Sequence, residues 1–369
     1  MAEFTTSSLY GDLTKVMKAR LDAATQKHVQ LYDNVQYEKF LDWDTPTVGL
    51  DFNELMGTYN MSIAAATIGD RSNEPVMDTD GVVTYPGSVY KHAITRPLTS
   101  QEYRKIIQLR DSKYIDDATV KNEIIKLMWK TTSEPIKAVQ NKLDLIFLTA
   151  LSNKGVFEFT RENNPLGGIH DEGIDYKMSD DNKAAVTVPW TEENLDTVDC
   201  FEDIQVMLEK ASGKADIGKI LVDQSVISYM LRTRKIKLIL NGTDRYSTPR
   251  FINDLNAFMS SNDMPEFEVI KRQIQVAKGK DSIKPWNAEN MVFVPAGKLG
   301  VIKNAFADSE IKQSPGVAYS NYGRIRVAQW SVGEKENSSF TEFAKAESLS
   351  LPVITEINGI FNLNLKGNK

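Results

Sequence analysis

Residues 131–154 read TTSEPIKAVQNKLDLIFLTALSNK, and the rest of the chain is best understood from this segment. Its apolar residues recur at steps of three and four, which places them on one side of an α-helix. These residues are Ile136, Val139, Leu143, Ile146 and Ala150, and the stripe is widened by Leu145, Phe147, Leu148 and Leu151. We therefore predict a helix whose second half is buried on nearly all sides.

The ends of this predicted helix carry residues that start and stop helices. Ser133 can accept a hydrogen bond from a first-turn amide, and Pro135 just inside the helix needs no partner for its missing N–H. Gly155 can adopt the left-handed conformation that ends a helix. A helix of about 20 residues is about 30 Å long, which suits the spine of a domain. Apolar residues upstream continue the period, so a kinked or two-part helix from about Ala118 is the alternative.

Composition sets wide bounds on the class of protein. The chain has 369 residues, of which 41% are hydrophobic and 25% charged, as in a soluble protein of two domains or one large one. The net charge of −6 argues against a dedicated nucleic-acid binder, which would show a basic excess. A single cysteine, Cys200, excludes an internal disulfide framework and indicates a reducing compartment. No apolar run reaches about 18 residues and no leader follows Met1, so we expect neither a membrane span nor an export signal.

Residues 59–105 contain a second informative pattern. Residues 59–65 alternate between apolar and polar as a strand does, and a returning strand is expected at about 89–95. The residues between are rich in Gly, Pro and Asp, and a structureless loop of that length is unusual inside a compact domain. We therefore predict a long hairpin that projects from the body. Because two strands alone are marginal in water, the hairpin should lie on a neighbouring subunit.

Residues 1–48 read as an arm and not as a compact unit, although a helix packed on its own domain is an equally open interpretation. They combine a short amphipathic pattern with a mixed polar and aromatic run. The arm and the hairpin supply the candidate inter-subunit contacts. These are Trp43 from the arm, and Tyr59, Met61, Ile63, Asp70, Arg71, Glu74 and Tyr90 from the hairpin.

Beyond the predicted spine helix, short strands and helices alternate. We predict strands at 156–159, 186–190, 219–222, 267–270, 291–295 and 324–330, and helices at 191–211, 225–231 and 251–258. The block 191–339 is thus an α/β region inserted between the spine and the tail. The tail alternates at 349–353 and again at 361–365, so we expect it to be tied into a sheet.

One segment resembles a phosphate-binding loop but departs from it in two ways. Residues 213–219 read GKADIGK, followed by Ile220 where a Ser or Thr must hold Mg²⁺. The segment also follows a predicted helix and enters a strand, whereas a phosphate loop leaves a strand and opens a helix. We interpret residues 213–219, including Lys219, as a helix-to-strand turn.

The remaining candidates for chemistry are weak. His28, His92 and His170 are too scattered to form a local metal cluster. His170-Asp171-Glu172 could bind a cation within its glycine-rich loop, but a solvated polar turn is the favoured interpretation. Cys200 lies in an apolar helical pattern, so a core thiol is favoured over a nucleophile. We therefore predict no catalytic, cofactor-binding or metal-binding residue, and no enzymatic activity.

The order of these elements, together with four short motifs, resembles a known family. The motifs are NMVFVPAGKLG at 290–300, which leaves a core strand, GRIRV at 323–327, the strand after it, ESLSLPV at 347–353, a closing stretch, and NKL at 141–143 within the spine. The chain resembles the major capsid protein of tailed double-stranded DNA phages with the Hong Kong 97-type fold, and is most similar to its lambda-type branch.

This resemblance implies an α+β fold with four parts. They are an N-terminal arm (1–48), an extended hairpin called the E-loop (49–105), a peripheral domain with the spine helix (106–190 and 340–369) and an α/β axial domain (191–339). The function implied is a head protein that self-assembles into hexamers and pentamers of an icosahedral shell around phage DNA. The implied location is the virion capsid, with the host cytoplasm during procapsid assembly.

The resemblance also implies partners. They are other copies of the chain, a portal, a decoration protein, and packaged DNA held without sequence-specific contacts. No membrane is implied. Some family members carry a cleaved N-terminal scaffolding segment, for which residues 1–48 leave little room, so a separate scaffolding protein is expected.

Two alternatives stay open. One is an encapsulin-like shell, which has the same fold and encloses protein cargo, and a neighbouring cargo-enzyme gene would favour it. The other is a soluble α/β enzyme or binding protein, which would be a monomer or small oligomer that binds a small ligand saturably.

Overall fold

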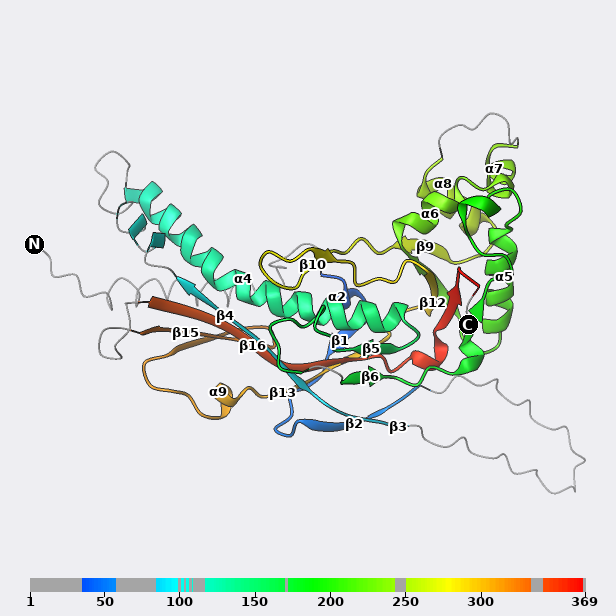
Figure 1. Ribbon diagram of the computed structural model, residues 1–369. Coiled ribbons are helices and arrows are strands. Elements are labelled where there is room, and N and C mark those ends of the chain that lie inside the picture. Colours follow the sequence, from blue (N-terminus) through cyan, green and yellow to red (C-terminus); the bar gives the residue numbers. More distant parts are fainter. Residues whose placement is uncertain are drawn as a thin grey trace, which may run out of the picture.

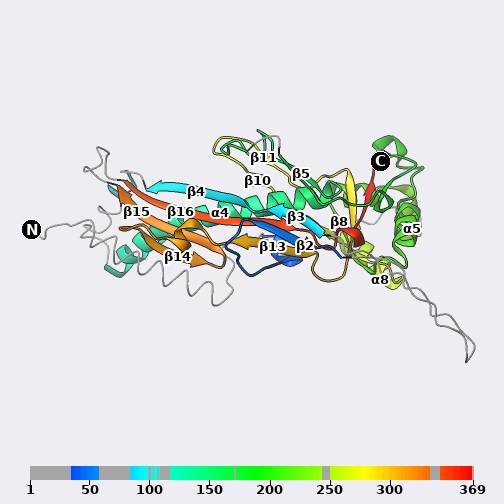
Figure 2. The ribbon, with the colours of Figure 1, turned by 90° about the horizontal axis from the view of Figure 1, so that it is seen from below.

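The computed structural model describes residues 35–57, 84–98, 101–102, 104–105, 108, 117–169, 172–242, 250–332 and 341–367. Within these ranges, the side chains of residues 117–128 and 331 are not described. The molecule has an elongated body built along one long helix, and a second α/β unit rises at one end of it (Figure 1). Seen from below, the body is long and narrow (Figure 2). No helix among the described residues is both long and apolar enough to cross a membrane.

The long helix is α4 (Asp117–Ser152), and its 36 residues span about 54 Å. The predicted start near Ser133 is wrong. The alternative, a kinked or two-part helix from about Ala118, has the right start, but the structure has a single helix there. Pro135 lies inside the helix, where it removes one backbone hydrogen bond at a cost of about 3 kcal/mol. Burial of apolar side chains in the turns that follow Pro135 offsets this cost, since Ile136 and Leu143 are fully buried.

The predicted end of this helix is confirmed. Gly155 has φ +84° and its N–H donates to the carbonyl of Ala150 at 2.8 Å, which satisfies one of the last helical carbonyls. The Ser133 hydroxyl lies 3.5 Å from the Lys130 carbonyl, within the helix, so it caps nothing. Because local capping preferences are worth only about 1 kcal/mol, packing of the helix on the sheet decides where it begins.

A six-stranded sheet runs under α4 and forms the other layer of the body (Figures 1 and 2). Its central strand is the 13-residue β16 (Thr341–Val353), which is antiparallel to β4, β15 and β13. The remaining strands are β4 (Tyr90–Leu98), β15 (Ile325–Val332), β14 (Ala318–Tyr322), β13 (Gly300–Ala305) and β1 (Leu41–Trp43). Gly300 is required at its position, because a Cβ there would lie 2.0 Å from the carbonyl oxygen of Val353.

The second unit is built on a five-stranded sheet. In spatial order its strands are β7 (Lys183–Ala185), β17 (Phe361–Asn364), β12 (Asn290–Pro295), β8 (Ile217–Val222) and β9 (Glu266–Val269). Four helices accompany it: α5 (Cys200–Ala211), α6 (Gln224–Met230), α7 (Arg234–Asn241) and α8 (Ile252–Ser261). Every residue of β12 is buried, as expected for a central strand covered on both faces. The predicted tie of the C-terminal tail into a sheet is confirmed by β17.

Three two-stranded pairs and several short helices complete the described chain. The pairs are β2 (Asp51–Leu55) with β3 (Thr84–Ser88), β5 (Val156–Glu158) with β6 (Gly173–Asp175), and β10 (Ile274–Gln275) with β11 (Ser282–Ile283). The short helices are α2 (Tyr37–Phe40), α9 (Asp308–Ile311) and the 3₁₀ turns Asp180–Asn182, Glu192–Asn194 and Ile357–Gly359.

The predicted hairpin strands are partly corrected. The returning strand expected at 89–95 is β4, and it pairs with β16 along nine residue pairs from Glu342↔Leu98 to Ser350↔Tyr90. The described hairpin is instead β2 with β3, in register from Asp51↔Ser88 to Leu55↔Thr84. The strand expected at 59–65 lies outside the described residues. Long-range pairing with β16 fixes β4, and no local pattern reveals such a partner.

The block predicted at 191–339 as one α/β region is divided between the two sheets. Strands β13, β14 and β15 leave the second unit and join the long sheet beside β16. The tail divides in the same way, because β16 lies in the long sheet and β17 in the second unit.

Two local predictions need correction, and other elements were not predicted. The helix expected at 191–211 is broken, and α5 begins at Cys200 because the Asp199 carboxylate accepts the N–H of Glu202 at 3.2 Å as an N-cap. The strand expected at 186–190 lies three residues earlier, as β7. Helix α7 and strands β13 and β14 were not predicted.

Candidate functional site: surfaces available for assembly

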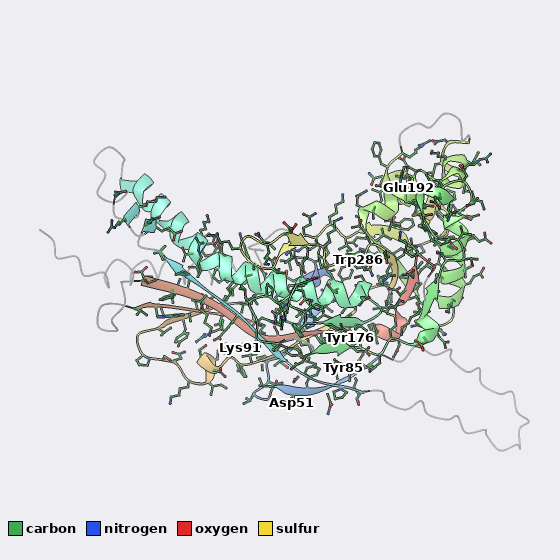
Figure 3. All side chains as sticks on the ribbon, in the orientation of Figure 1. Asp51, Tyr85, Lys91, Tyr176, Glu192 and Trp286 are labelled. Atoms are coloured by element: carbon green, nitrogen blue, oxygen red, sulfur yellow. The ribbon has the colours of Figure 1, made fainter. Side chains whose placement is uncertain are left out.

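The root of the hairpin is anchored to the body by aromatic stacking. Tyr85 on β3 packs against Phe52 on β2, with ring centroids 6.3 Å apart, and against Tyr176, with centroids 5.2 Å apart. Burial raises the pKa of Tyr85 to about 12, so its hydroxyl stays neutral. Tyr85 and Tyr176 lie close together on the side of the body where β2 and β3 run (Figure 3). The root is therefore a fixed platform.

Apolar side chains beside this root face solvent. Val48 and Leu55 are 75% and 64% exposed, and Leu50 is also exposed. Val48 and Leu50 precede β2 and Leu55 ends it, and no described part of the chain buries these side chains. Exposed apolar groups gathered at a rigid platform are typical of a contact surface.

Two of the eight candidate contact residues are described, and both pack within their own chain. Trp43 meets Tyr37 edge to face with centroids 6.2 Å apart, and Tyr90 packs on Phe159 with centroids 5.0 Å apart. Contact of either residue with another subunit stays a prediction. Tyr59, Met61, Ile63, Asp70, Arg71 and Glu74 lie outside the described residues.

A second apolar surface lies on the helices of the α/β unit and was not predicted. Leu238 and Ile239 on α7 are exposed, and Phe251 at the start of α8 is 66% exposed. Helix α7 buries Ile236 fully and Leu240 partly, and it turns Leu238 and Ile239 outward. The alternation of Lys with Ile and Leu at 235–240 is the sequence signal that could have identified an amphipathic helix with an unpartnered face.

A buried ion pair joins the chain near residue 36 to the middle of α4. The Asp144 carboxylate accepts the backbone N–H of Tyr37 at 2.8 Å and of Gln36 at 3.0 Å, and the Nε of Arg272 at 2.8 Å. The side chains of Asp144 and Arg272 are 0% and 2% exposed. Burial raises the pKa of Asp144 to about 6, against the lowering effect of Arg272, so the group is charged at neutral pH. Neither residue was predicted from the sequence, although an Asp between leucines in a buried stretch is a signal for such a pair.

His92 on β4 is buried in its neutral form. One of its ring nitrogens, Nε2, lies 3.1 Å from the carbonyl oxygen of Ser350 and donates to it in the neutral tautomer. Burial lowers the pKa of His92 to about 4, with a further contribution from the nearby Lys142 charge. His170 and Asp171 lie outside the described residues.

His92 should make stability fall as the pH drops. Between about pH 6.5 and 4 the unfolded chain binds the proton and the folded chain does not, so each step down in pH favours unfolding. From pH 7.5 to 5.5, we expect wild type to lose about 1 kcal/mol relative to His92→Gln in urea unfolding. Asp144 acts in the opposite direction, and the comparison with the variant at each pH cancels it. Equal pH profiles for the two proteins would contradict this assignment.

The residues considered for nucleotide binding and nucleophilic chemistry have structural roles. Residues 213–219 connect α5 to β8, which confirms the predicted helix-to-strand turn. The Lys219 ammonium pairs with the Glu268 carboxylate at 2.7 Å on the neighbouring strand β9. Cys200 is buried, and burial raises the pKa of its thiol well above the usual range. Within the described ranges, no group of three His, Cys, Asp or Glu side chains could hold a metal ion.

We expect Lys219→Ala to be nearly silent. The pair with Glu268 is half exposed, so its loss should change the free energy of unfolding by less than about 1 kcal/mol. Isothermal titration with Mg·ATP should detect no binding in either protein. Mg²⁺-dependent ATP binding that disappears in the variant would overturn the interpretation as a turn.

The chain was compared with known proteins by sequence and by structure. No protein-family model matches the chain, and no curated protein matches its sequence. Among solved structures, a protein assigned as a prophage capsid protein of E. coli CFT073 superposes with a TM-score of 0.58 at 11% identity. The superposition covers 94% of this chain and 98% of that chain, so the two folds correspond almost from end to end. This chain has the Hong Kong 97-type fold.

Two further solved structures are similar to this chain. A phage-related protein from Bordetella bronchiseptica RB50 matches the Hong Kong 97-type fold of this chain with a TM-score of 0.50 at 9% identity, over 96% of this chain and 98% of that one. The capsid of Myoviridae phage XM1 matches with a TM-score of 0.45 at 10% identity, over 91% and 93%. The predicted α+β class is thus confirmed. The lambda-type branch and the four domain boundaries stay predictions.

Proposed function

We propose that this protein is a structural subunit of an icosahedral phage head, which self-assembles into hexamers and pentamers around double-stranded DNA. The observation that carries the proposal is the end-to-end match to a fold found in an assigned prophage capsid protein. A fold alone does not establish function. The distribution of exposed apolar side chains adds a second, independent line of support.

The two apolar surfaces suit a shell subunit because they lie on different parts of an elongated molecule. One is the β2–β3 root with Val48, Leu50 and Leu55, and the other is the outer face of α7 and α8 with Leu238 and Phe251. A subunit that contacts neighbours through several different surfaces makes heterologous contacts, and such contacts close into rings. We assign the α7–α8 surface to contacts around the ring axis and the β2–β3 root to contacts between adjacent subunits.

The partners and location follow from this role. We propose self-assembly with a separate scaffolding protein, a portal and a decoration protein, first in the host cytoplasm and then as the virion capsid. We propose that the protein has a structural role and no enzymatic activity. The net charge of −6 suits a container, because the DNA inside is held by confinement and not by groove recognition. The match to prophage and phage proteins favours this role over an encapsulin-like shell or a soluble α/β enzyme.

Assembly of the purified protein tests the proposal. Expressed alone or with a candidate scaffolding protein from the neighbouring genes, the chain should form pentamers, hexamers or closed shells visible by analytical ultracentrifugation and electron microscopy. DNA recovered from shells formed in phage-infected cells would separate a phage head from a protein-cargo shell. A monomer that persists at high concentration under all conditions would refute the proposal.

A further inference from the structure

A groove of about 550 Å³ lies over α4 and has no role in the surfaces described above. Its walls come from four segments: α4 between Ala138 and Leu145, strand β4, the loop 159–169 and residues 274–278. None of its lining residues is Asp or Glu, although the protein as a whole is acidic. The groove is therefore a local non-acidic site on an acidic molecule.

Lys142 is one of three lysines that line this groove, with Lys91 and Lys278. Its Nζ donates to the backbone carbonyl of Asn163 at 3.1 Å and to the side-chain oxygen of Asn164 at 3.3 Å. The ammonium also lies 5.2 Å from the centre of the Phe159 ring. Among the described residues, no carboxylate lies within ion-pair distance of it. Burial lowers the pKa of Lys142 to about 8, as expected for an ammonium removed from water without a compensating anion.

Other buried or half-buried cations of the described chain do have carboxylate partners. Arg272 pairs with Asp144, and Lys303 pairs with both Asp44 and Glu54. Lys91, which also lines the groove, already pairs with Asp308 at 3.2 Å and Glu347 at 3.4 Å. Because a half-buried charge without a nearby carboxylate is unfavourable, an added carboxylate would bind favourably to the Lys142 ammonium.

The rest of the groove is apolar and partly open. Val139, Leu145 and Ile274 form buried walls, and neutral His92 is another lining residue. At the rim, Leu166 is 75% exposed and Ile94 is also exposed. A small ligand in the groove would leave these rim side chains in water, whereas an amphipathic segment of a protein would cover them.

We propose that this groove binds an acidic amphipathic segment of an assembly partner, with a carboxylate of the segment paired to Lys142 and its apolar side chains on Val139, Leu145 and Ile274. The segment's role in assembly rests on the proposed function. The binding itself does not, because it can be measured on unassembled subunits.

The experiment uses the unassembled full-length subunit and a fluorescein-labelled synthetic helix of about 14 residues with Leu on one face and Glu flanking it. Fluorescence anisotropy measures its affinity for wild type and for Lys142→Met, with Lys312→Met as the control. Lys312 is exposed and outside the groove, so its loss changes the net charge equally. A matched peptide with Gln in place of Glu completes a double-mutant cycle.

We expect Lys142→Met to weaken binding of the Glu peptide by about tenfold, and Lys312→Met by less than twofold. Against Lys142→Met, the Glu and Gln peptides should bind alike. Ala138→Trp, which fills the groove without touching the lysine charge, should abolish binding. Equal binding to wild type and Lys142→Met, or equal binding of both peptides to wild type, would overturn the inference.

Two further arms separate this inference from its rivals. If the subunit binds decanoate but not the Glu peptide, the groove is a small-ligand site and the inference is overturned. Peptide binding by a protein that never assembles would refute the proposed function and leave the groove assignment standing. If a subunit that binds no acidic peptide still forms normal shells, the groove assignment is refuted and the proposed function stands.

Discussion

Replacing residues 58–83 with a short Gly-Ser linker is expected to leave the subunit folded and to abolish shell formation. These residues connect β2 to β3, which end next to each other at the Leu55↔Thr84 pair, so a short linker can close the hairpin. The new loop would not strain the body, because both roots are held independently. Gly57 donates its N–H to the carbonyl of Thr355 at 2.9 Å, and Tyr85 packs on Tyr176.

The reason for the expected loss is that a two-stranded hairpin with a tip rich in Gly, Pro and Asp is marginal in water by itself, so this segment should lie on a neighbouring subunit. We therefore expect the side chains of residues 58–83 to contact another subunit, and shells to need that contact. Differential scanning calorimetry should give a melting temperature within about 2 °C of wild type, since no described core residue is removed. Electron microscopy should show no closed shells.

A linker of the same length as residues 58–83 but composed of Gly and Ser is the matched control. It keeps the spacing and removes the side chains, so it should also fail to form shells if Tyr59, Met61, Ile63, Asp70, Arg71 and Glu74 make the contacts. A shortened protein that melts far lower yet assembles normally would place this segment in the core of its own subunit and contradict the prediction.

Asp144→Ala is expected to destabilise the subunit more than any other single substitution considered. It removes the buried carboxylate that pairs with the Arg272 guanidinium, and with it the acceptor for the amides of Gln36 and Tyr37. Breaking a buried ion pair from one side typically costs about 3–5 kcal/mol. Urea unfolding monitored by tryptophan fluorescence should show this loss, together with early exposure of the segment around Tyr37 to limited proteolysis.

Two variants identify the cause of that loss. Asp144→Ala combined with Arg272→Met removes both charges, so it should recover part of the stability, with the two backbone amides still unpaired. Lys39→Met disrupts a half-exposed pair with Glu268 close to the same segment and should cost less than about 1 kcal/mol. If the double variant is no more stable than Asp144→Ala alone, the unpaired charge is not the cause.

Much of the candidate site depended on distant residues. The hairpin root was expected near residues 59 and 95 and lies at 51–55 with 84–88. The reason is that β4 pairs with β16, which lies near the far end of the chain. The apolar face of α7 was missed because an eight-residue helix rich in Lys carries a weak local signal. The groove around Lys142 could not be foreseen, since its walls come from four segments that only folding brings together.

The sequence by itself determined the elements whose residues interact with near neighbours in the chain. The apolar period of α4, the left-handed end at Gly155, the turn at 213–219 and the tie of the tail into a sheet all follow from short-range patterns. Only the tertiary structure decided that α4 continues through Pro135, that β13–β15 return to the long sheet, and that Asp144 meets Arg272 across 128 positions. The physical reason is that burial and long-range pairing contribute several kcal/mol at such positions, which exceeds the local preference of about 1 kcal/mol per residue on which sequence patterns depend.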